Sequence, residues 1–319
     1  MNKQTWSKTV NFNLLPEWFE IREPVKTALA EGRPVVALES TLIAHGLPYP
    51  MNLQTAYQAE AIVQDHNCVP ATIAVLAGKA VIGIDKAAID QIATSTGIEK
   101  ASRRDLPGII YQKKSAAVTV AASIYLANLA GISVFATGGI GGVHRELPGQ
   151  MSRDISADLT ELARTPIITV CSGAKNILDL HSTLELLETL SVPVVGFRCD
   201  YFPAFYVQQS EWKLPLRLNE SYQIAELYRF HFSINSGSLL LVQSAPNAVS
   251  QEEFQKWLQP VEQQANRLGV HGPDRTPFLL RGLAHESAGK TLEINQKLIV
   301  QNAKLAAQIG RDLYSSTKS

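Results

Sequence analysis

Cysteine is scarce in this chain of 319 residues, and its scarcity excludes two classes of protein. The cysteines are Cys68, Cys171 and Cys199, which lie far apart and form no CxxC or CxH pattern. Their spacing therefore predicts neither a zinc motif nor a redox motif. An odd number at this low density is typical of a reducing compartment rather than of a disulfide scaffold. We therefore expect a cytoplasmic location.

Net charge is also absent. Lysine and arginine together number 29, as do aspartate and glutamate, so the formal net charge is 0. Such a balance gives no general attraction to nucleic acid or to an anionic membrane, and we expect neither as a partner. An anionic ligand would need a local site. The hydrophobic fraction of 45% is enough for a large core and excludes a mainly disordered chain.

Two segments of the chain are candidates for a targeting signal or a membrane span. The first 20 residues contain no continuous apolar core, so they do not resemble a signal peptide. Residues 115–139 carry no charge, but small and polar residues interrupt them and the pattern changes near Gly131. We interpret this stretch as a buried helix followed by a buried strand, not as a membrane helix.

Short β-branched runs alternate with helical periodicity along the chain. Several of the runs lack polar alternation, as expected of strands that are covered on both faces. The pattern predicts an α/β protein, a three-layer α/β/α sandwich with a mostly parallel, mixed central sheet. The expected strands are 34–38, 71–76, 132–136, 167–171, 192–197 and 238–242, and the expected helices are 52–65, 157–163, 176–190 and stretches within 276–313.

No segment has the composition of a linker that would divide the chain into domains. We expect a single α/β domain over residues 21–313, with an N-terminal extension at 1–20 and a C-terminal tail at 314–319. Segment 201–235 is rich in aromatic and polar residues and only weakly periodic. It is interpreted as an excursion over the sheet edge or as an oligomer contact.

In open α/β sheets, ligands bind beyond the carboxyl ends of the strands. Glu39 stands at such an end, after the run 34–38. A partly buried glutamate has a raised pKa and can donate a proton near neutrality. The alternative is a structural carboxylate that is tied to a backbone amide or an arginine.

A glycine-rich segment, residues 136–145, follows the run 132–136. Its four glycines allow a ligand to approach the backbone closely. Their spacing is neither GxGxxG nor GxxxxGK[ST], so neither a dinucleotide site nor a Walker site is supported. His144, at the end of this segment, is a candidate base or ligand contact, or a polar residue satisfied within the fold.

Two aspartates, Asp154 and Asp158, lie four residues apart. On a helix that begins near Asp154 they would share a face and could hold a hard divalent cation through carboxylates and waters. The alternative is a helix N-cap followed by an acid in the first turn.

Lys175 follows the run 167–171 in a turn of small residues. Partial burial at a helix N-terminus would favour its uncharged amine, a nucleophile that can form an imine with a sugar aldehyde. The alternative is a lysine that faces solvent. The basic cluster at 100–105 is a candidate phosphate contact or a solvated charged face.

Taken together, these motifs resemble the pseudouridine-5'-phosphate glycosidase family, also called the indigoidine synthase A-like family. They occur in order over about residues 21–312. The matching stretches are ALEST and HGLPYP (37–50), SRRDLP (102–107), FATGGIGGVHR (135–145), DISADLTEL (154–162), CSGAKNILD (171–179), PVVGF (193–197), FPAFY (202–206), NSGSLLL (235–241) and TPFLL (276–280).

The resemblance implies reversible cleavage of the C–C glycosidic bond of pseudouridine 5'-phosphate to uracil and ribose 5-phosphate. It also implies an α/β/α fold, a homotrimer and a divalent cation, usually Mn²⁺. Residue by residue, it implies roles for positions that match the family's motifs. These are Glu39 as proton donor, Lys175 as the amine that bonds to ribose C1', Asp154 as metal ligand, Lys100, Val120, Ser156, Ala157 and Asp158 as substrate contacts, and Asn295 as an asparagine near the base.

Some positions depart from the family pattern. Ala116 and Val118 stand where the family has glycine and threonine, and residues 207–211 replace a Thr-Arg-x-Ser-Gly stretch. These departures keep a second hypothesis open, a C-glycoside synthase that joins ribose 5-phosphate to another aromatic or heterocyclic acceptor. A third hypothesis is a non-catalytic nucleotide-binding regulator. The joint presence of Glu39, Asp154, Asp158 and Lys175 argues against it.

Overall fold

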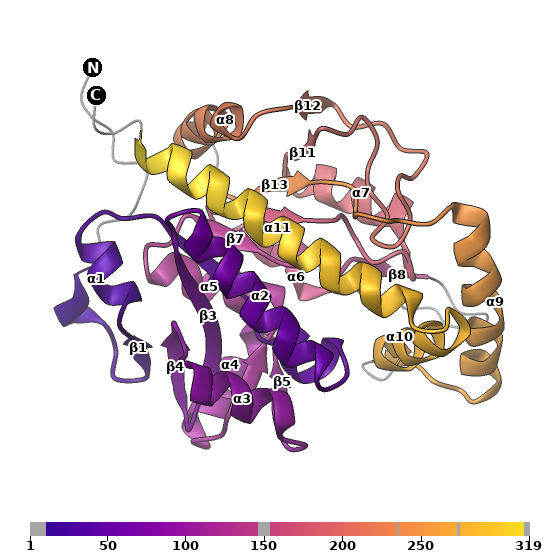
Figure 1. Ribbon diagram of the computed structural model, residues 1–319, viewed down its shortest axis with the longest axis horizontal. Coiled ribbons are helices and arrows are strands. Elements are labelled where there is room, and N and C mark those ends of the chain that lie inside the picture. The colour runs from indigo at the N-terminus through magenta and orange to yellow at the C-terminus, as the bar shows by residue number, and fades with distance from the viewer. Residues whose placement is uncertain (1–10, 146–153, 235, 273–274, 316–319) are drawn as a thin grey trace.

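The computed structural model describes residues 11–145, 154–234, 236–272 and 275–315, in which an eleven-stranded mixed sheet lies between two layers of helices (Figure 1). The main path of the sheet runs through nine strands. In order across the sheet they are β1 (Phe19–Ile21), β4 (Lys79–Ile82), β3 (Val69–Leu76), β2 (Val35–Leu38), β7 (Val134–Ala136), β9 (Ile168–Cys171), β13 (Leu239–Val242), β11 (Val194–Phe197) and β12 (Leu216–Leu218). Two further strands, β5 (Glu99–Ala101) and β6 (Ala116–Val118), branch from β3.

The middle of the sheet is parallel. From β3 through β2, β7, β9, β13 and β11 to β12, each strand pairs with the next in parallel register. The antiparallel pairs in this sheet join β3 to β4 and to β6. The prediction of a mostly parallel mixed sheet is therefore confirmed.

Helices cover both faces of the sheet. On one face, α11 (Lys290–Ser315) lies beside α2 (Met51–Asp65) and α8 (Ser221–Ile234) and crosses the central strands (Figure 1). On the other face, α5 (Val120–Leu129) packs against α6 (Ala157–Leu162) and against β2 and β3. The remaining α-helices of the described residues are α1 (Val25–Ala30), α3 (Lys86–Thr94), α4 (Leu106–Tyr111), α7 (Leu180–Thr189), α9 (Gln251–Arg267) and α10 (Arg275–Glu286).

The uncharged stretch 115–139 folds as expected. It holds β6, the buried helix α5 and the buried strand β7 in succession. Within the ranges that the structure describes, no helix combines the length and the apolar character needed to cross a membrane.

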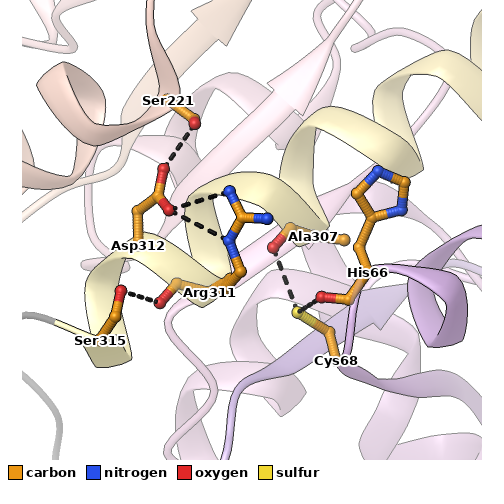
Figure 2. A network of polar contacts seen from close by, with 7 residues as sticks. All are labelled: His66, Cys68, Ser221, Ala307, Arg311, Asp312 and Ser315. Carbon is orange, nitrogen blue, oxygen red and sulfur yellow. Dashed lines mark hydrogen bonds and ion pairs between the residues drawn. The ribbon is translucent and has the colours of Figure 1, made fainter.

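The C-terminal part of α11 is fastened to its neighbours by polar contacts (Figure 2). The Ser221 hydroxyl donates to Asp312 at 2.5 Å, which ties α11 to the start of α8. The Cys68 thiol donates to the carbonyl of Ala307 at 3.1 Å. Burial raises the pKa of Cys68 to about 11, so this thiol stays protonated and structural at neutral pH.

Three sequence expectations need correction. Segment 201–235, expected as an excursion over the sheet edge or as an oligomer contact, does reach the sheet edge through β12, but it also contains the helix α8, which was not expected. The helix expected at 176–190 begins only at Leu180, because Asp179 caps it by accepting from the Ser182 amide at 2.9 Å. The sheet also includes Phe19 and Glu20, at the end of the expected extension, through the pairing of β1 with β4.

Candidate active site

Three loops that follow neighbouring strands form the centre of the candidate site. β2, β7 and β9 are adjacent and parallel, so their carboxyl ends share one edge of the sheet. Glu39 follows β2, the glycine-rich loop (residues 137–142) follows β7, and the turn 172–175 follows β9. The structure therefore brings the three loops together beyond the strand ends, where ligands bind in open α/β sheets.

Glu39 is half-buried and accepts a hydrogen bond from the Thr137 hydroxyl. Burial raises the pKa of this carboxyl because desolvation disfavours its charged form. The Thr137 hydrogen bond and the charges of Lys175 and Lys100 oppose that rise, while the charge of Asp158 adds to it. The balance favours a carboxyl that still holds its proton at a higher pH than an ordinary glutamate.

Lys175 points its amine back at the glycine-rich loop. Its Nζ donates to the carbonyl of Gly139 at 3.3 Å, and its side chain is half-buried. The turn before it requires glycine, since Gly173 has φ +77° and a Cβ there would lie 1.9 Å from the carbonyl oxygen of Pro203. Lys175 sits in this turn rather than at a helix N-terminus, because α7 starts five residues later.

Asp158 joins two distant parts of the site. Its side chain is buried, Oδ1 accepts from the Ala121 amide at 2.9 Å, and Oδ2 accepts from the Gly141 amide at 2.9 Å. The carboxylate thus ties the first turn of α5 to the glycine-rich loop. Ser156 is the N-cap of α6, and its hydroxyl accepts from the Asp158 amide at 3.2 Å.

The expectation that Asp154 and Asp158 share one helix face is wrong. α6 begins at Ala157, and Asp154 precedes it in extended chain, where its carbonyl accepts from the His144 amide at 2.9 Å. The Asp154 side chain is 54% exposed, and its Oδ2 lies 3.9 Å from Nε2 of His144. Burial lowers the pKa of His144, although the nearby Asp154 carboxylate acts in the opposite direction.

An exposed carboxylate beside an imidazole fits a hard divalent cation that keeps most of its waters. Such ions are commonly held by one or two carboxylates together with substrate phosphates. Over the described residues there is no cluster of three or more His, Cys, Asp and Glu side chains placed to hold a metal. Among the described residues, Asp154 therefore suits an ion that takes few protein ligands and keeps water molecules in its other coordination positions.

The other expected contacts surround these groups. Lys100, on β5, is exposed along part of its side chain, while its ammonium is partly desolvated. That desolvation lowers its pKa, as does the charge of Lys175, against the opposing charges of Asp158 and Glu39. Val120 is the buried first residue of α5, and Ala157 is the exposed first residue of α6. Asn295, on α11, is buried, with Oδ1 3.5 Å from where a Cβ on Gly138 would lie.

Arg103 corrects the interpretation of the basic cluster at 100–105. Its guanidinium donates to both carboxylate oxygens of Glu161, at 2.8 and 2.6 Å, and lies 4.1 Å from the ring centroid of Tyr125. Arg103 thus ties the segment to α5 and α6 through these contacts. Of the cations in this cluster, Lys100 is the one whose charge acts on Glu39.

Asn302 supports the site and was not expected from the sequence. Its amide donates to the carbonyls of Thr137, at 2.8 Å, and Gly138, at 3.3 Å. Its Oδ1 accepts from Nε2 of Gln243 at 2.8 Å. This buried network fixes the start of the glycine-rich loop. A single asparagine in a long amphipathic helix carries no sequence signal for such a role.

The chain matches the family described as indigoidine synthase A like protein over residues 24–312. It is 44% identical over 299 residues to a pseudouridine-5'-phosphate glycosidase of Caldanaerobacter subterraneus subsp. tengcongensis, covering 93% of this chain and 97% of the relative. This chain belongs to the indigoidine synthase A-like family.

Two solved structures of this family share the fold at 34% sequence identity. The prealnumycin C-glycosynthase AlnA, in complex with ribulose 5-phosphate, superposes with a TM-score of 0.87 over 95% of this chain and 99% of its own. An indigoidine synthase A-like protein of Thermotoga maritima superposes with a TM-score of 0.83 over 93% of this chain and 96% of its own.

The departures from the family pattern fall into two environments. Ala116 and Val118 are fully buried in β6 and belong to the hydrophobic core. The Val118 amide donates to the buried Ser40 hydroxyl at 3.0 Å, a bond that does not depend on the side chain at position 118. Of residues 207–211, Gln208, Gln209 and Glu211 are exposed. This segment, and not the buried strand β6, is therefore the departure that is accessible to a ligand.

Proposed function

We propose that this protein catalyses the reversible cleavage of the C–C glycosidic bond of pseudouridine 5'-phosphate to uracil and ribose 5-phosphate. The names of its relatives and the ribulose 5-phosphate bound to AlnA support a sugar-phosphate C-glycoside as the substrate class. The observation that carries the proposal is the half-buried Lys175, whose charge acts on Glu39, a carboxyl whose pKa is raised by burial.

In the proposed mechanism Glu39 and Lys175 have separate roles. A C–C bond to a base cannot be broken by protonating a leaving oxygen, so the usual two-carboxylate route of glycosidases is insufficient. Glu39 instead donates its proton to the ribose ring oxygen, which opens the ring. The amine of Lys175 then adds to C1', which conjugation with uracil has made electrophilic. Protonation at the base carbon breaks the C–C bond and leaves an imine on Lys175, which water hydrolyses to ribose 5-phosphate.

The remaining residues bind and orient the substrate in this proposal. Asp154 holds a divalent cation, which we propose is Mn²⁺; when bound, it supplies positive charge that organises waters and the phosphate. Lys100 places a second positive charge near the same ligand. The other proposed substrate contacts are Val120, Ser156, Ala157, Asp158 and Asn295.

We also propose that the protein is a cytoplasmic homotrimer. The cysteines Cys68, Cys171 and Cys199 are all free, which supports a reducing compartment. The trimer is supported by the resemblance to the family and is tested by light scattering of the purified protein, where a monomeric mass would reject it.

A second candidate function is a C-glycoside synthase that joins ribose 5-phosphate to another acceptor. The similarity to AlnA, a C-glycosynthase, and the altered segment 207–211 favour keeping it. The first function predicts uracil release from pseudouridine 5'-phosphate in the presence of Mn²⁺. Failure with that substrate, together with coupling of another acceptor to ribose 5-phosphate, would favour the second.

Borohydride trapping with ribose 5-phosphate tests the chemistry common to both candidates. We expect a covalent adduct that peptide mass analysis locates on Lys175. The absence of both turnover and adduct would leave a non-catalytic nucleotide-binding protein as the remaining explanation.

A further inference from the structure

A cavity lies on the side of Glu39 that is covered by α2 and α11. It is lined by residues of β2, β3, β7, α2 and α11 and by the turn before α2, and it is large enough to hold a water molecule. Most of the lining is apolar. Its polar side chains are Glu39, Thr137 and Thr72, and Thr72 comes from β3, on the far side of β2 from Thr137.

Thr72 connects this cavity to a second carboxyl group. Its side chain is buried, and its hydroxyl donates to Oε1 of Glu60 at 2.6 Å. A hydroxyl donates one bond and accepts another, so Thr72 can accept from a protonated Glu60 while it donates to a water in the cavity. A single residue thus stands between the space behind Glu39 and a carboxylate on α2.

Glu60 is placed to exchange protons with solvent. It is half-buried on α2. Desolvation raises the pKa of its carboxyl, while the Thr72 hydrogen bond and the charge of Lys86, on α3, oppose the rise. The groups whose charges act on Glu39 are different ones, namely Lys175, Asp158 and Lys100. The two carboxyls therefore lie in separate electrostatic surroundings.

We propose that Glu60, Thr72 and one water in this cavity form a proton relay that returns a proton to Glu39 while the substrate occupies the site. The proton balance is simple. When Glu60 is protonated, the Thr72 hydrogen turns from Glu60 to the water. Glu60 then gives its proton to the Thr72 oxygen, Thr72 gives its own to the water, and the water gives one to the Glu39 carboxylate. Thr72 and the water end unchanged, and Glu60 regains a proton from solvent.

This relay rests on the proposed function, because it serves a reaction that needs an acid twice. The ring oxygen takes one proton and the base carbon takes another, both while ligand covers the site. Once Glu39 has given its proton to the ring oxygen, a route through the cavity can restore it without release of the ligand. A merely structural Glu60–Thr72 pair would tie α2 to β3 and would not act on the proton-transfer steps.

Matched variants separate these two roles. Thr72→Val removes the hydroxyl at nearly constant shape, Glu60→Gln removes the titrating group, and Thr72→Ser keeps the relay. Asp65→Asn, an exposed acid on the same helix, serves as the control for loss of charge. For Thr72→Val and Glu60→Gln we expect kcat for uracil release to fall about tenfold, a modest part of what general acid catalysis contributes, with KM unchanged. Thr72→Ser and Asp65→Asn should behave as wild type.

A proton inventory, the reaction rate measured in mixtures of H₂O and D₂O, distinguishes the relay from a structural role. A purely structural contact would leave the dependence of the rate on deuterium fraction unchanged. The wild-type rate should depend on deuterium fraction with the curvature of several moving protons, and Thr72→Val should lose that curvature. Wild-type kcat and curvature in both Thr72→Val and Glu60→Gln would overturn the relay. So would a high-resolution crystal structure with no water between the Thr72 hydroxyl and Glu39.

Failure of the proposed function is recognised separately, in the wild type. If the wild type releases no uracil but forms the ribose 5-phosphate adduct, the variants are compared by the rate of adduct formation, where the relay again predicts slowing in Thr72→Val and Glu60→Gln. If the wild type does neither, the proposed function fails and the relay, having no reaction to serve, falls with it.

Discussion

The hydroxyl of Thr137 donates a hydrogen bond to the carboxyl of Glu39, across two strands whose ends lie 98 residues apart in the chain. The contact exists because β2 and β7 are parallel neighbours, with Leu38 in register with Ala136. It sets the direction in which the Glu39 carboxyl points. It also moderates the effect of burial on the pKa of that group.

Thr137→Val should therefore shift the pH dependence of activity. The Thr137 hydrogen bond lowers the pKa of Glu39, so its removal lets burial raise that pKa further. Because the protonated carboxyl is the proposed acid, the loss of activity on the alkaline side should move to higher pH. The plateau rate should also fall about tenfold, because the carboxyl loses the contact that orients it. The measurement is kcat against pH, and Thr137→Ser should match wild type.

Glu39→Gln should lose most activity and gain stability above acid pH. Loss of a general acid typically costs about 10²- to 10⁴-fold in rate. Because burial raises the folded-state pKa of Glu39 above its unfolded value, the folded protein binds the proton more tightly. The wild type therefore loses stability as pH rises from the unfolded pKa through the folded pKa, and the glutamine variant does not. Thermal unfolding at several pH values should show the difference vanish at low pH. Equal stability at neutral pH would contradict the assigned pKa direction.

Lys175→Ala should abolish turnover and leave the fold intact. The half-buried amine contacts the Gly139 carbonyl, and its loss removes the proposed nucleophile. We expect uracil release to fall by at least about a thousandfold, within the range known for removal of a catalytic nucleophile. The exposed Lys213 offers a matched control, since Lys213→Ala should retain full activity. Appreciable residual turnover, or an adduct that persists in Lys175→Ala, would remove Lys175 from this role.

Asp158→Asn should weaken both the fold and the site. The carboxylate accepts from the amides of Ala121 and Gly141, whereas a carboxamide can accept at only one of its two polar atoms. One buried amide then loses its acceptor, which costs about 1–3 kcal/mol of unfolding free energy. Denaturant unfolding measures this loss, and hydrogen exchange should show faster opening at Gly141 or Ala121. Unchanged stability would mean that the two amides find other acceptors.

Asp154→Ala should weaken metal binding without harm to the fold. Its side chain is 54% exposed, so little packing is lost. We expect Mn²⁺ to stimulate the wild type, a chelator to abolish that stimulation, and Asp154→Ala to require a higher Mn²⁺ concentration. Titration of free Mn²⁺ by electron paramagnetic resonance measures binding apart from activity. Equal Mn²⁺ affinity in the variant would place the ion elsewhere.

Local patterns in the sequence were enough for the central strands and for several site residues. Apolar β-branched runs mark the central strands, since strands covered on both faces need no polar alternation. A charged residue directly after such a run, as at Glu39, or in a turn of small residues, as at Lys175, is unusual enough to be noticed. The roles of these residues came from the resemblance to the family and not from spacing.

The places where the sequence was misleading involve hydrogen-bond partners, one near in the chain and one remote. Asp154 and Asp158 suggested one helix face, but Ser156 caps the helix between them. Arg103 suggested a phosphate contact, but Glu161 on another helix holds it. Capping and ion pairing depend on which groups packing brings within reach, and residue spacing does not report this.

By itself, the sequence determined the alternation of strands and helices, the buried character of the sheet, and the positions of the acid, the amine and the glycines near strand ends. Only the tertiary structure decided that β2, β7 and β9 lie side by side, that Asp158 accepts from two separate backbone amides, and that Thr72 joins Glu60 to the space behind Glu39. The physical reason is that periodicity records whether a residue is buried, whereas strand order and hydrogen-bond partners follow from how the whole core packs.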